Sequence, residues 1–151
     1  MRHSNACDAW HQTATSDDGE GAYRAMSQAL RMARMSPDAI HYVNTHGTGT
    51  PDNDAAELAA MHRLFGDRLP HYASTKSLTG HTTSASGAIE AIFCILGLCH
   101  GFMPSGMPTL SPADKSGAML QHPLAGDGYT AALCNSFGFG GNDSSLLFTR
   151  P

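Results

Sequence analysis

Residues 41–51 read His-Tyr-Val-Asn-Thr-His-Gly-Thr-Gly-Thr-Pro. The first four residues have the composition of a short buried strand. This strand leads directly into a loop of small residues, and Asn53 or Asp54, shortly after Pro51, can cap a helix. A strand followed by a loop and a helix is the repeating unit of α/β proteins. The stretch therefore predicts an α/β fold.

Apolar spacing predicts three helices. In the first, over residues 21–35, apolar side chains recur at helical intervals after an acidic segment that suits a helix N-terminus. The second has an apolar stripe between Leu58 and Phe65 and ends at Gly66. The third, over residues 84–99, is apolar on nearly every face apart from Glu90, which predicts a helix in the interior of the protein.

Three further strands are predicted, over residues 71–74, 129–136 and 144–149. The last two are joined by a glycine-rich segment at 137–143, where glycine permits positive φ and close backbone approach. Residues 101–127 are rich in Gly, Pro and Ser and predict a long, partly extended loop. The order helix, strand, helix, strand, helix, strand, strand predicts one layered α/β domain with a mixed sheet over residues 1–151.

Composition excludes several classes of partner. The formal net charge is −4 and the Lys and Arg residues are scattered, so we expect no nucleic-acid binding. The longest apolar run, residues 91–99, is too short to cross a bilayer, so we expect no membrane span. The cysteines lack the spacing of a metal site and favour a reducing cytosol, which predicts no metal and a cytoplasmic location. They are Cys7, Cys94, Cys99 and Cys134.

Two histidines stand in loops of the kind where ligands bind in α/β proteins. His46 follows the first predicted strand, and His81 lies at the start of the apolar helix. The positive end of a helix dipole disfavours an imidazolium, so we expect a neutral His81 ring whose N–H can donate to an oxyanion. A single histidine in such a loop is more often structural, and the two together favour a catalytic site.

Lys76 and Glu90 form a second candidate pair. Glu90 is the one charged residue in the apolar helix, and a buried carboxylate requires a partner. Lys76 follows the neighbouring strand and is the natural partner. The pair could fix the loop on the helix, act in the catalytic site, or do both. A lysine cation there would also favour the neutral form of His81.

Two motifs leave alternatives open. Phe-Gly-Phe-Gly-Gly at 137–141 lacks the spacing of a dinucleotide fingerprint, and its aromatic side chains could be core residues. Thr48 and Thr50 offer hydroxyls beside His46. These hydroxyls could bind a polar substrate arm or only bond within their own turn.

Three segments, in this order and spacing, resemble the C-terminal signatures of the β-ketoacyl-acyl carrier protein synthases. They are His-Gly-Thr-Gly-Thr-Pro at 46–51, Ser-Thr-Lys-Ser-Leu-Thr-Gly-His at 74–81 and Asn-Ser-Phe-Gly-Phe-Gly-Gly at 135–141. Cys-Asp-Ala-Trp-His at 7–11 is similar to the segment that opens the C-terminal half of the elongating type. The resemblance implies the C-terminal half of a thiolase-like αβαβα layered fold.

The resemblance also implies an acyltransferase. In this family an acyl chain on a cysteine of the N-terminal half condenses with malonyl-acyl carrier protein as carbon dioxide leaves. The implied partners are acyl carrier protein, whose phosphopantetheine carries the substrates, the N-terminal half of the same enzyme, and a homo- or heterodimer partner. No cofactor bound by this chain is implied.

Individual residues take roles from the same resemblance. His46 and His81 would stabilise the thioester oxygen as malonyl becomes an enolate, and Lys76 is the third catalytic candidate. The supporting residues would be Glu90, Asp54 and Glu57. Contacts with substrate or the phosphopantetheine arm would come from Thr48, Thr50, Phe137, Gly138, Phe139 and Gly140, with Phe139 matching the gating phenylalanine.

The chain also departs from the family pattern. None of its cysteines lies in the sequence setting of the family's nucleophile, so we expect the isolated chain to be inactive. Asn142-Asp143 stands where many members have Thr-Asn, and residues 82–86 replace a more apolar stretch. Either change could mark a specialised branch with unusual acyl substrates, such as polyene or secondary-metabolite chains.

Two other functions fit the same fold. A non-catalytic partner comparable to chain-length factors would have no need of His46, His81 and Lys76. A degradative thiolase would carry a second catalytic cysteine in the glycine-rich C-terminal loop, where this chain has Phe-Gly-Phe-Gly-Gly. A partial β-ketoacyl synthase is therefore the leading hypothesis, and an isolated half should expose a large apolar patch.

Overall fold

The computed structural model describes residues 1–107, 116–126 and 128–150. Its strands are β1 (Arg2–Cys7), β2 (Tyr42–Asn44), β3 (His71–Ala73), β4 (Phe102–Met103), β5 (Leu124–Ala125), β6 (Ala131–Gly138) and β7 (Asn142–Thr149). Its α-helices are α1 (Glu20–Ala33), α2 (Pro51–Phe65), α3 (Lys76–Thr79) and α4 (Ser86–His100), with 3-10 helices at Pro37–Ala39 and Thr83–Ala85. The predicted helices and strands are all present, with ends that differ by a few residues. The predicted loop over 101–127 contains β4 and β5, and part of it lies outside the described residues.

Five strands form one mixed sheet in the order β1-β7-β6-β2-β3. β6 and β7 are an antiparallel hairpin, and β1 pairs antiparallel with β7. β2 lies between β6 and β3 and is parallel to both. A parallel pair needs a crossover connection, which α2 supplies between β2 and β3. β2 is therefore an inner strand, and β4 and β5 form a separate two-stranded sheet.

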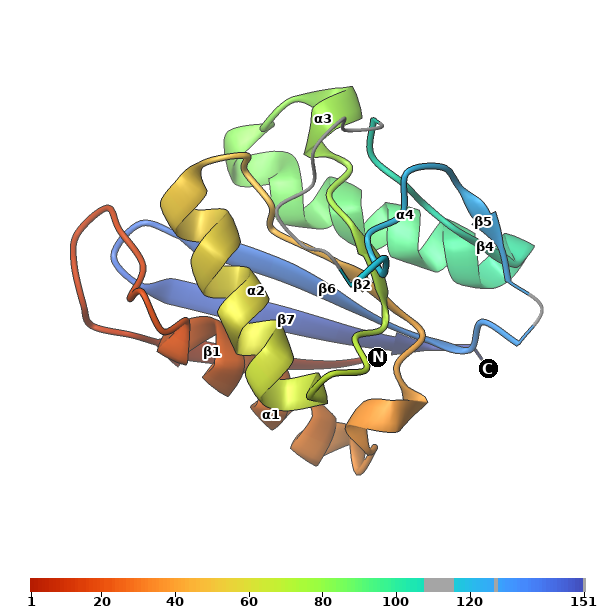
Figure 1. The fold of residues 1–151 in the computed structure, drawn as a ribbon, viewed down its shortest axis with the longest axis horizontal. Helices are drawn as coiled ribbons and strands as arrows, with labels where there is room; N and C mark the ends of the chain where they lie inside the picture. The colour runs from red at the N-terminus through yellow and green to blue at the C-terminus, as the bar shows by residue number, and fades with distance from the viewer. Residues whose placement is uncertain (108–115, 127, 151) are drawn as a thin grey trace.

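Two apolar cores lie on opposite faces of the sheet, because successive side chains of a strand point to opposite faces. On one face, Met26 of α1 and Met61 of α2 pack in the same core as Val43. On the other face, Cys94 of α4 packs in the same core as Tyr42. Figure 1 shows α4 on one side of the sheet and α1 and α2 on the other. This is the layered α/β arrangement with a mixed sheet that the sequence predicts.

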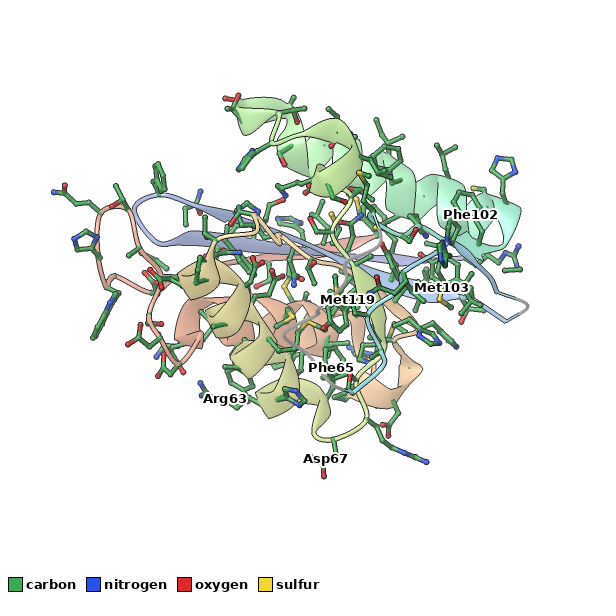
Figure 2. The ribbon with its side chains drawn as sticks, turned by 45° about the horizontal axis from the view of Figure 1, so that its top comes forward. Arg63, Phe65, Asp67, Phe102, Met103 and Met119 are labelled. Carbon is green, nitrogen blue, oxygen red and sulfur yellow. The ribbon has the colours of Figure 1, made fainter. Side chains whose placement is uncertain are left out.

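The segments that follow α2 and α4 lie at the edges of the two helical layers. Figure 2 shows Arg63, Phe65 and Asp67 at the C-terminal end of α2, and Phe102 and Met103 beside α4. Met103 belongs to the core under α4. The short strands β4 and β5 therefore extend the α4 side of the molecule.

The sequence pattern does not predict β1. Its residues, Arg-His-Ser-Asn-Ala-Cys, lack the apolar alternation of a half-buried strand. The strand forms because β7 offers an edge along which all six residues pair, from Arg2 with Leu147 to Cys7 with Asn142. Tertiary pairing therefore overrides weak local propensity at this position.

The start of α2 differs from the prediction. The helix begins at Pro51, and Thr50 occupies the N-cap in an extended conformation, so Asn53 and Asp54 lie inside the first turn. Proline suits that position because the first N–H groups of a helix have no partner within it and its φ is already helical. The predicted cap at Asn53 or Asp54 is therefore wrong, and Asp54 binds another group, described below.

Helix α4 is not interior on all sides, so the prediction of a fully buried helix is wrong. Only one face of α4 meets the sheet, and its buried residues are Ser86, Glu90, Cys94, Gly97 and Leu98. Ile92, Ile95 and Leu96 are 54%, 43% and 41% exposed. By length and composition alone, Thr83–His100 could cross a membrane, with 28% of that window buried. Here α4 packs on the sheet and carries a buried, paired carboxylate.

Candidate active site

His46 lies just beyond the carboxyl end of the inner strand β2. The N–H of Thr45 donates to the carbonyl of Ala73, which continues the pairing of β2 with β3 past Asn44. His46 itself is 6% exposed. Ligand sites in open α/β sheets lie off such strand ends, so the structure puts His46 where the sequence predicts it.

Glu57 of α2 holds the backbone of His46. Its carboxylate accepts the N–H of His46 and the N–H of Gly47, each at 3.0 Å, and the side-chain amide of Asn135 at 2.9 Å. Burial raises the pKa of Glu57 to about 7, and these three hydrogen bonds oppose the rise. Glu57 therefore supports His46 through the backbone rather than through its ring.

Lys76 and Glu90 form the predicted ion pair. Lys76 begins α3, and its Nζ donates to Oε1 of Glu90 on the buried face of α4. Their side chains are 5% and 2% exposed. Ser86 donates to the same carboxylate oxygen at 3.2 Å. Burial raises the pKa of Glu90, and the bonds from Lys76 and Ser86 oppose the rise. The pair fixes α3 on α4.

His81 is exposed and directly follows Gly80, the residue at the C-cap of α3. Its Nδ1 accepts the N–H of Thr83 at 3.1 Å, so the proton of the neutral ring lies on Nε2. The helix α4 begins only at Ser86, after the 3-10 turn Thr83–Ala85. The expectation that the dipole of this helix acts on His81 is therefore corrected: a local hydrogen bond orients the ring and leaves Nε2–H as a donor.

The two histidine rings meet edge to face. Their centroids are 5.5 Å apart and their planes lie at 85°, and the ring of Phe137 lies 5.5 Å from that of His46. Burial, followed by the charge of Lys76 and the neighbouring His81, lowers the pKa of His46 to about 3. His46 is therefore uncharged at pH 7. The ring of His46 and the Nε2–H of His81 can each donate an N–H to a developing oxyanion.

A cavity of about 1230 Å³ opens beside these groups. Its polar side includes Thr48, Thr50, Lys76 and His81, and its apolar side includes Leu58, Met61, Tyr72 and Met119. Such a cavity suits an elongated ligand with one polar and one apolar part.

Thr48 and Thr50 bond within their own turn. Their Oγ1 atoms are 2.9 Å apart, and Asp54 accepts the N–H of Gly49 at 3.2 Å, which fixes the same loop. Both hydroxyls also line the cavity. The structure thus has the local bonding that the sequence left as one alternative, and contact with a substrate arm stays a prediction.

The hairpin tip between β6 and β7 is more open. Phe139 is 81% exposed, with Gly138 and Gly140 on either side of it. The N–H of Gly140 donates to the carbonyl of Gln12 at 2.8 Å, which ties the tip to the loop after β1. The structure therefore brings Phe137, but not Phe139, against His46, and the gating role of Phe139 stays a prediction.

Several site residues are not singled out by the sequence. Ser74 donates to the carbonyl of Gly47 at 2.7 Å, and Ser86 binds Glu90. Asn135, the first residue of the motif at 135–141, donates to Glu57 and accepts the hydroxyl of Ser145 at 2.9 Å. A polar residue inside the otherwise apolar strand at 129–136 is the signal that identifies Asn135. The serines carry no such signal.

Within residues 1–107, 116–126 and 128–150, no three His, Cys, Asp or Glu side chains are arranged to hold a metal ion. The cysteines are free thiols, of which Cys94 and Cys134 are buried and Cys7 and Cys99 exposed.

A mixed five-stranded sheet with helices on both faces is the layered arrangement of a thiolase-like α/β fold. The sequence matches the family described as beta-ketoacyl synthase, C-terminal domain, over residues 2–109. The 3-oxoacyl-[acyl-carrier-protein] synthase 2 of Vibrio cholerae is 39% identical over 148 residues, which cover 95% of this chain and 36% of that protein. The corresponding protein of Rhizobium meliloti is 42% identical over 146 residues, covering 95% and 34%.

Solved structures give the same result. The ketosynthase ApeO in complex with its chain length factor ApeC from Xenorhabdus doucetiae matches with a TM-score of 0.90 and 39% identity, covering 100% of this chain and 38% of that chain. The ishigamide ketosynthase/chain length factor matches with a TM-score of 0.87 and 32% identity, covering 99% and 37%. The chain therefore belongs to the β-ketoacyl synthase family, as its motifs predict. It spans about a third of the length of the curated relatives it matches.

Proposed function

We propose that this chain is the C-terminal part of a β-ketoacyl-acyl carrier protein synthase that condenses an acyl thioester with malonyl-acyl carrier protein. The observation that carries the proposal is the approach of the uncharged ring of His46 to the ring of His81, which lines a large cavity. The relatives named 3-oxoacyl-[acyl-carrier-protein] synthase support the same reaction class.

In the proposed step, the malonyl carboxylate leaves as carbon dioxide and its electron pair forms an enolate on the thioester. The N–H groups of His46 and His81 donate to the enolate oxygen, where negative charge develops. The enolate carbon then attacks the acyl carbonyl held on a cysteine, and the cysteine sulfur leaves and takes up a proton. The products are carbon dioxide, a β-ketoacyl thioester on the carrier protein and the free cysteine.

The remaining site residues take positions around this step. Lys76 places a cation near His46 while Glu90 and Ser86 hold it, so the imidazole stays uncharged. Thr48 and Thr50 contact the phosphopantetheine arm of the carrier protein from the cavity wall. Phe139, with Gly138 and Gly140, gates access to the nucleophile from the open hairpin tip. Glu57 and Asp54 keep the loop between β2 and α2 in place.

The nucleophilic cysteine comes from the N-terminal half of the enzyme, so this chain alone is inactive. The exposed side chains of Ile92, Ile95 and Leu96 on α4 support a missing partner, because contiguous apolar surface marks an interaction site. In the full enzyme we further propose a homo- or heterodimer that acts in the cytoplasm without a membrane span. Its acyl substrates could belong to polyene or secondary-metabolite chains.

Reconstitution tests the proposal. The chain is combined with an N-terminal ketosynthase half that carries the cysteine, an acyl thioester and malonyl-acyl carrier protein, and both the β-ketoacyl product and carbon dioxide are measured. We expect condensation only when both halves are present, and carbon dioxide release that falls when either histidine is replaced. Condensation by this chain alone would contradict the proposed division of the site.

A non-catalytic partner resembling a chain-length factor is the second candidate. Several structural neighbours are ketosynthases solved with chain length factors, which favours keeping it. A pure scaffold has no use for His46, His81 and the buried Lys76–Glu90 pair. Full activity of a reconstituted complex in which both histidines are replaced would favour this second function.

A further inference from the structure

A row of polar side chains crosses the sheet beneath α1. Ser4 of β1 pairs with Ser145 of β7, and Ser145 pairs with Asn135 of β6. All three are buried, at 4%, 0% and 0% exposure, on the face where the core is otherwise apolar. The row ends at Glu57 of α2, which binds the backbone beside His46. Buried polar groups are costly unless they are paired, and the side-chain bonds of this row run from Ser145 through Asn135 to Glu57, while the hydroxyl of Ser4 has no partner among the described residues.

Asn135 has one available orientation in this row. Its Nδ2 donates to Oε1 of Glu57 at 2.9 Å and to the thioether sulfur of Met26 at 3.3 Å, and its Oδ1 accepts the hydroxyl of Ser145 at 2.9 Å. A flipped amide would turn Oδ1 toward the carboxylate and place two acceptors against each other. Glu57 and Met26, which only accept, therefore keep the donor side of Asn135 on Glu57, and the hydroxyl of Ser145 supplies the donor that Oδ1 then needs.

Glu57 needs those donors. It is 3% exposed, and within the described part of the chain no ion pair gives it a cation. Three N–H groups, from His46, Gly47 and Asn135, are what stabilise its charge. The Asn135 bond is the largest effect that opposes burial in lowering the pKa of Glu57.

We propose that Asn135, oriented by Ser145, is a positioning residue that keeps Glu57 ionised as the acceptor of the His46 and Gly47 amides. The inference rests on the proposed function only for the role of His46. When Glu57 takes up a proton, one of its oxygens becomes a donor and the backbone amides lose charge-assisted bonds. His46 then loses the charge-assisted bond that holds its backbone at the end of β2.

Other charged groups face the same carboxyl. Asp54, one turn earlier on α2, raises the pKa of Glu57, and Glu57 in turn raises the pKa of Asp143 of β7 through like charge. Lys76 and His81 act on His46. Variants that test the Glu57 titration must therefore leave these four charged or titratable residues unchanged.

The test is an NMR titration of the whole chain. The backbone amide shifts of His46 and Gly47 are followed from pH 5 to pH 9 together with the side-chain carboxyl carbon of Glu57. In the unmodified chain we expect one common midpoint near the pKa of Glu57, about 7. Asn135→Leu should raise that midpoint by about one pH unit, since one hydrogen bond to a charged group is lost.

Ser145→Ala is the milder variant, which keeps the test decisive where Asn135→Leu does not fold. It should move the midpoint in the same direction by a smaller amount, because the Asn135 amide loses the bond that orients it. Ser144→Ala, at the neighbouring position of β7, is the matched control and should leave the midpoint unchanged. Unchanged midpoints in both Asn135→Leu and Ser145→Ala would overturn the inference.

A second measurement distinguishes a failure of this inference from a failure of the proposed function. The reconstituted enzyme is assayed for condensation across the same pH range. A shifted midpoint with a matching shift in the pH profile supports both proposals. A shifted midpoint with an unaltered profile refutes the proposed role of His46 and leaves the positioning inference supported.

Discussion

The rings of His46 and His81 meet at 85° with centroids 5.5 Å apart, but the protein holds them in different ways. His46 is buried, and its backbone N–H is bound by Glu57. His81 is exposed, and its described bond is the one its Nδ1 accepts from Thr83. One donor is therefore fixed from within the sheet and the other is presented by a loop, so the two should respond differently to substitution.

Replacement of either histidine tests their shared role. In a reconstituted enzyme, His46→Ala and His81→Ala should each lower condensation about 100- to 1000-fold, the loss typical for one oxyanion-hole donor. Activity and carbon dioxide release are measured together. His122→Ala, at an exposed histidine near β5, is the control and should retain activity. A full rate with both histidines replaced would rule out a donor role for them.

The Lys76–Glu90 pair makes a prediction about stability. Glu90→Gln keeps the shape and leaves the cation of Lys76 buried without its carboxylate, which should cost about 3–5 kcal/mol in the free energy of unfolding. Urea denaturation measures this loss. Glu20→Gln is a matched control in an exposed ion pair with Arg24 and Arg63, and it should change stability much less. Equal effects of the two substitutions would contradict the prediction.

The sequence predicts the helices and strands better than the contacts between them. The strand at 41–44, the helix that ends at Gly66 and the Lys76–Glu90 pair follow from residue types along a short stretch. Strand β1 does not, because pairing with β7 rather than its own composition creates it. The sequence marks Asn135 as a polar residue in an apolar strand, but not the polar row from Ser145 to Glu57, because its members come from three elements that only the sheet and α2 bring together.

The buried carboxyl of Asp143 should make the free energy of unfolding depend on pH. Burial and the like charges of Asp8 and Glu57 raise the pKa of Asp143 to about 7, and its Oδ2 has no hydrogen-bond partner among the described residues. The folded-state pKa lies above the ordinary value, so folding favours the protonated form. This contribution is fully present below about pH 4 and is lost as the pH rises through about 7.

Asp143→Asn should remove that loss. The amide is neutral at every pH and can donate to Asp8, so we expect the variant to gain on the order of 3 kcal/mol over the unmodified chain at pH 8 and little at pH 4. Unfolding free energies from pH 4 to pH 8 measure the difference. Asp67→Asn, at an exposed aspartate after α2 (Figure 2), should show no such pH-dependent gain. A parallel pair of pH curves for Asp143→Asn and the unmodified chain would contradict the prediction.

Gly97 should resist a substitution that normally stabilises helices. Alanine is the better helix former by about 1 kcal/mol, but a Cβ at Gly97 would lie 2.5 Å from the carbonyl oxygen of Phe102 and 3.2 Å from the ring of Tyr129. Gly97→Ala should therefore destabilise the chain by about 1–3 kcal/mol as α4 is pushed from β4. Thermal or urea unfolding measures this.

Ala88 provides the opposite case on the same helix. It is exposed, so Ala88→Gly should follow intrinsic propensity and cost about 1 kcal/mol. The two positions thus predict that alanine is preferred at 88 and glycine at 97. Stabilisation by Gly97→Ala would show that β4 can move away from α4 without loss.

The outer face of α4 is expected to bind another protein surface. The sequence predicts a helix buried on all sides, whereas this chain buries one face and exposes Ile92, Ile95 and Leu96 on the other. An apolar composition without matching burial is explained when a second surface covers the helix. The chain alone should therefore self-associate, and Ile95→Glu should reduce that association and also block recombination with an N-terminal half.

Met32→Glu is the control, since Met32 is a 49% exposed apolar residue on α1, across the sheet from α4. Sedimentation velocity at several concentrations measures the first effect and the reconstituted condensation assay the second. A chain that is monomeric at every concentration, or an Ile95→Glu variant that still recombines, would place the partner surface elsewhere.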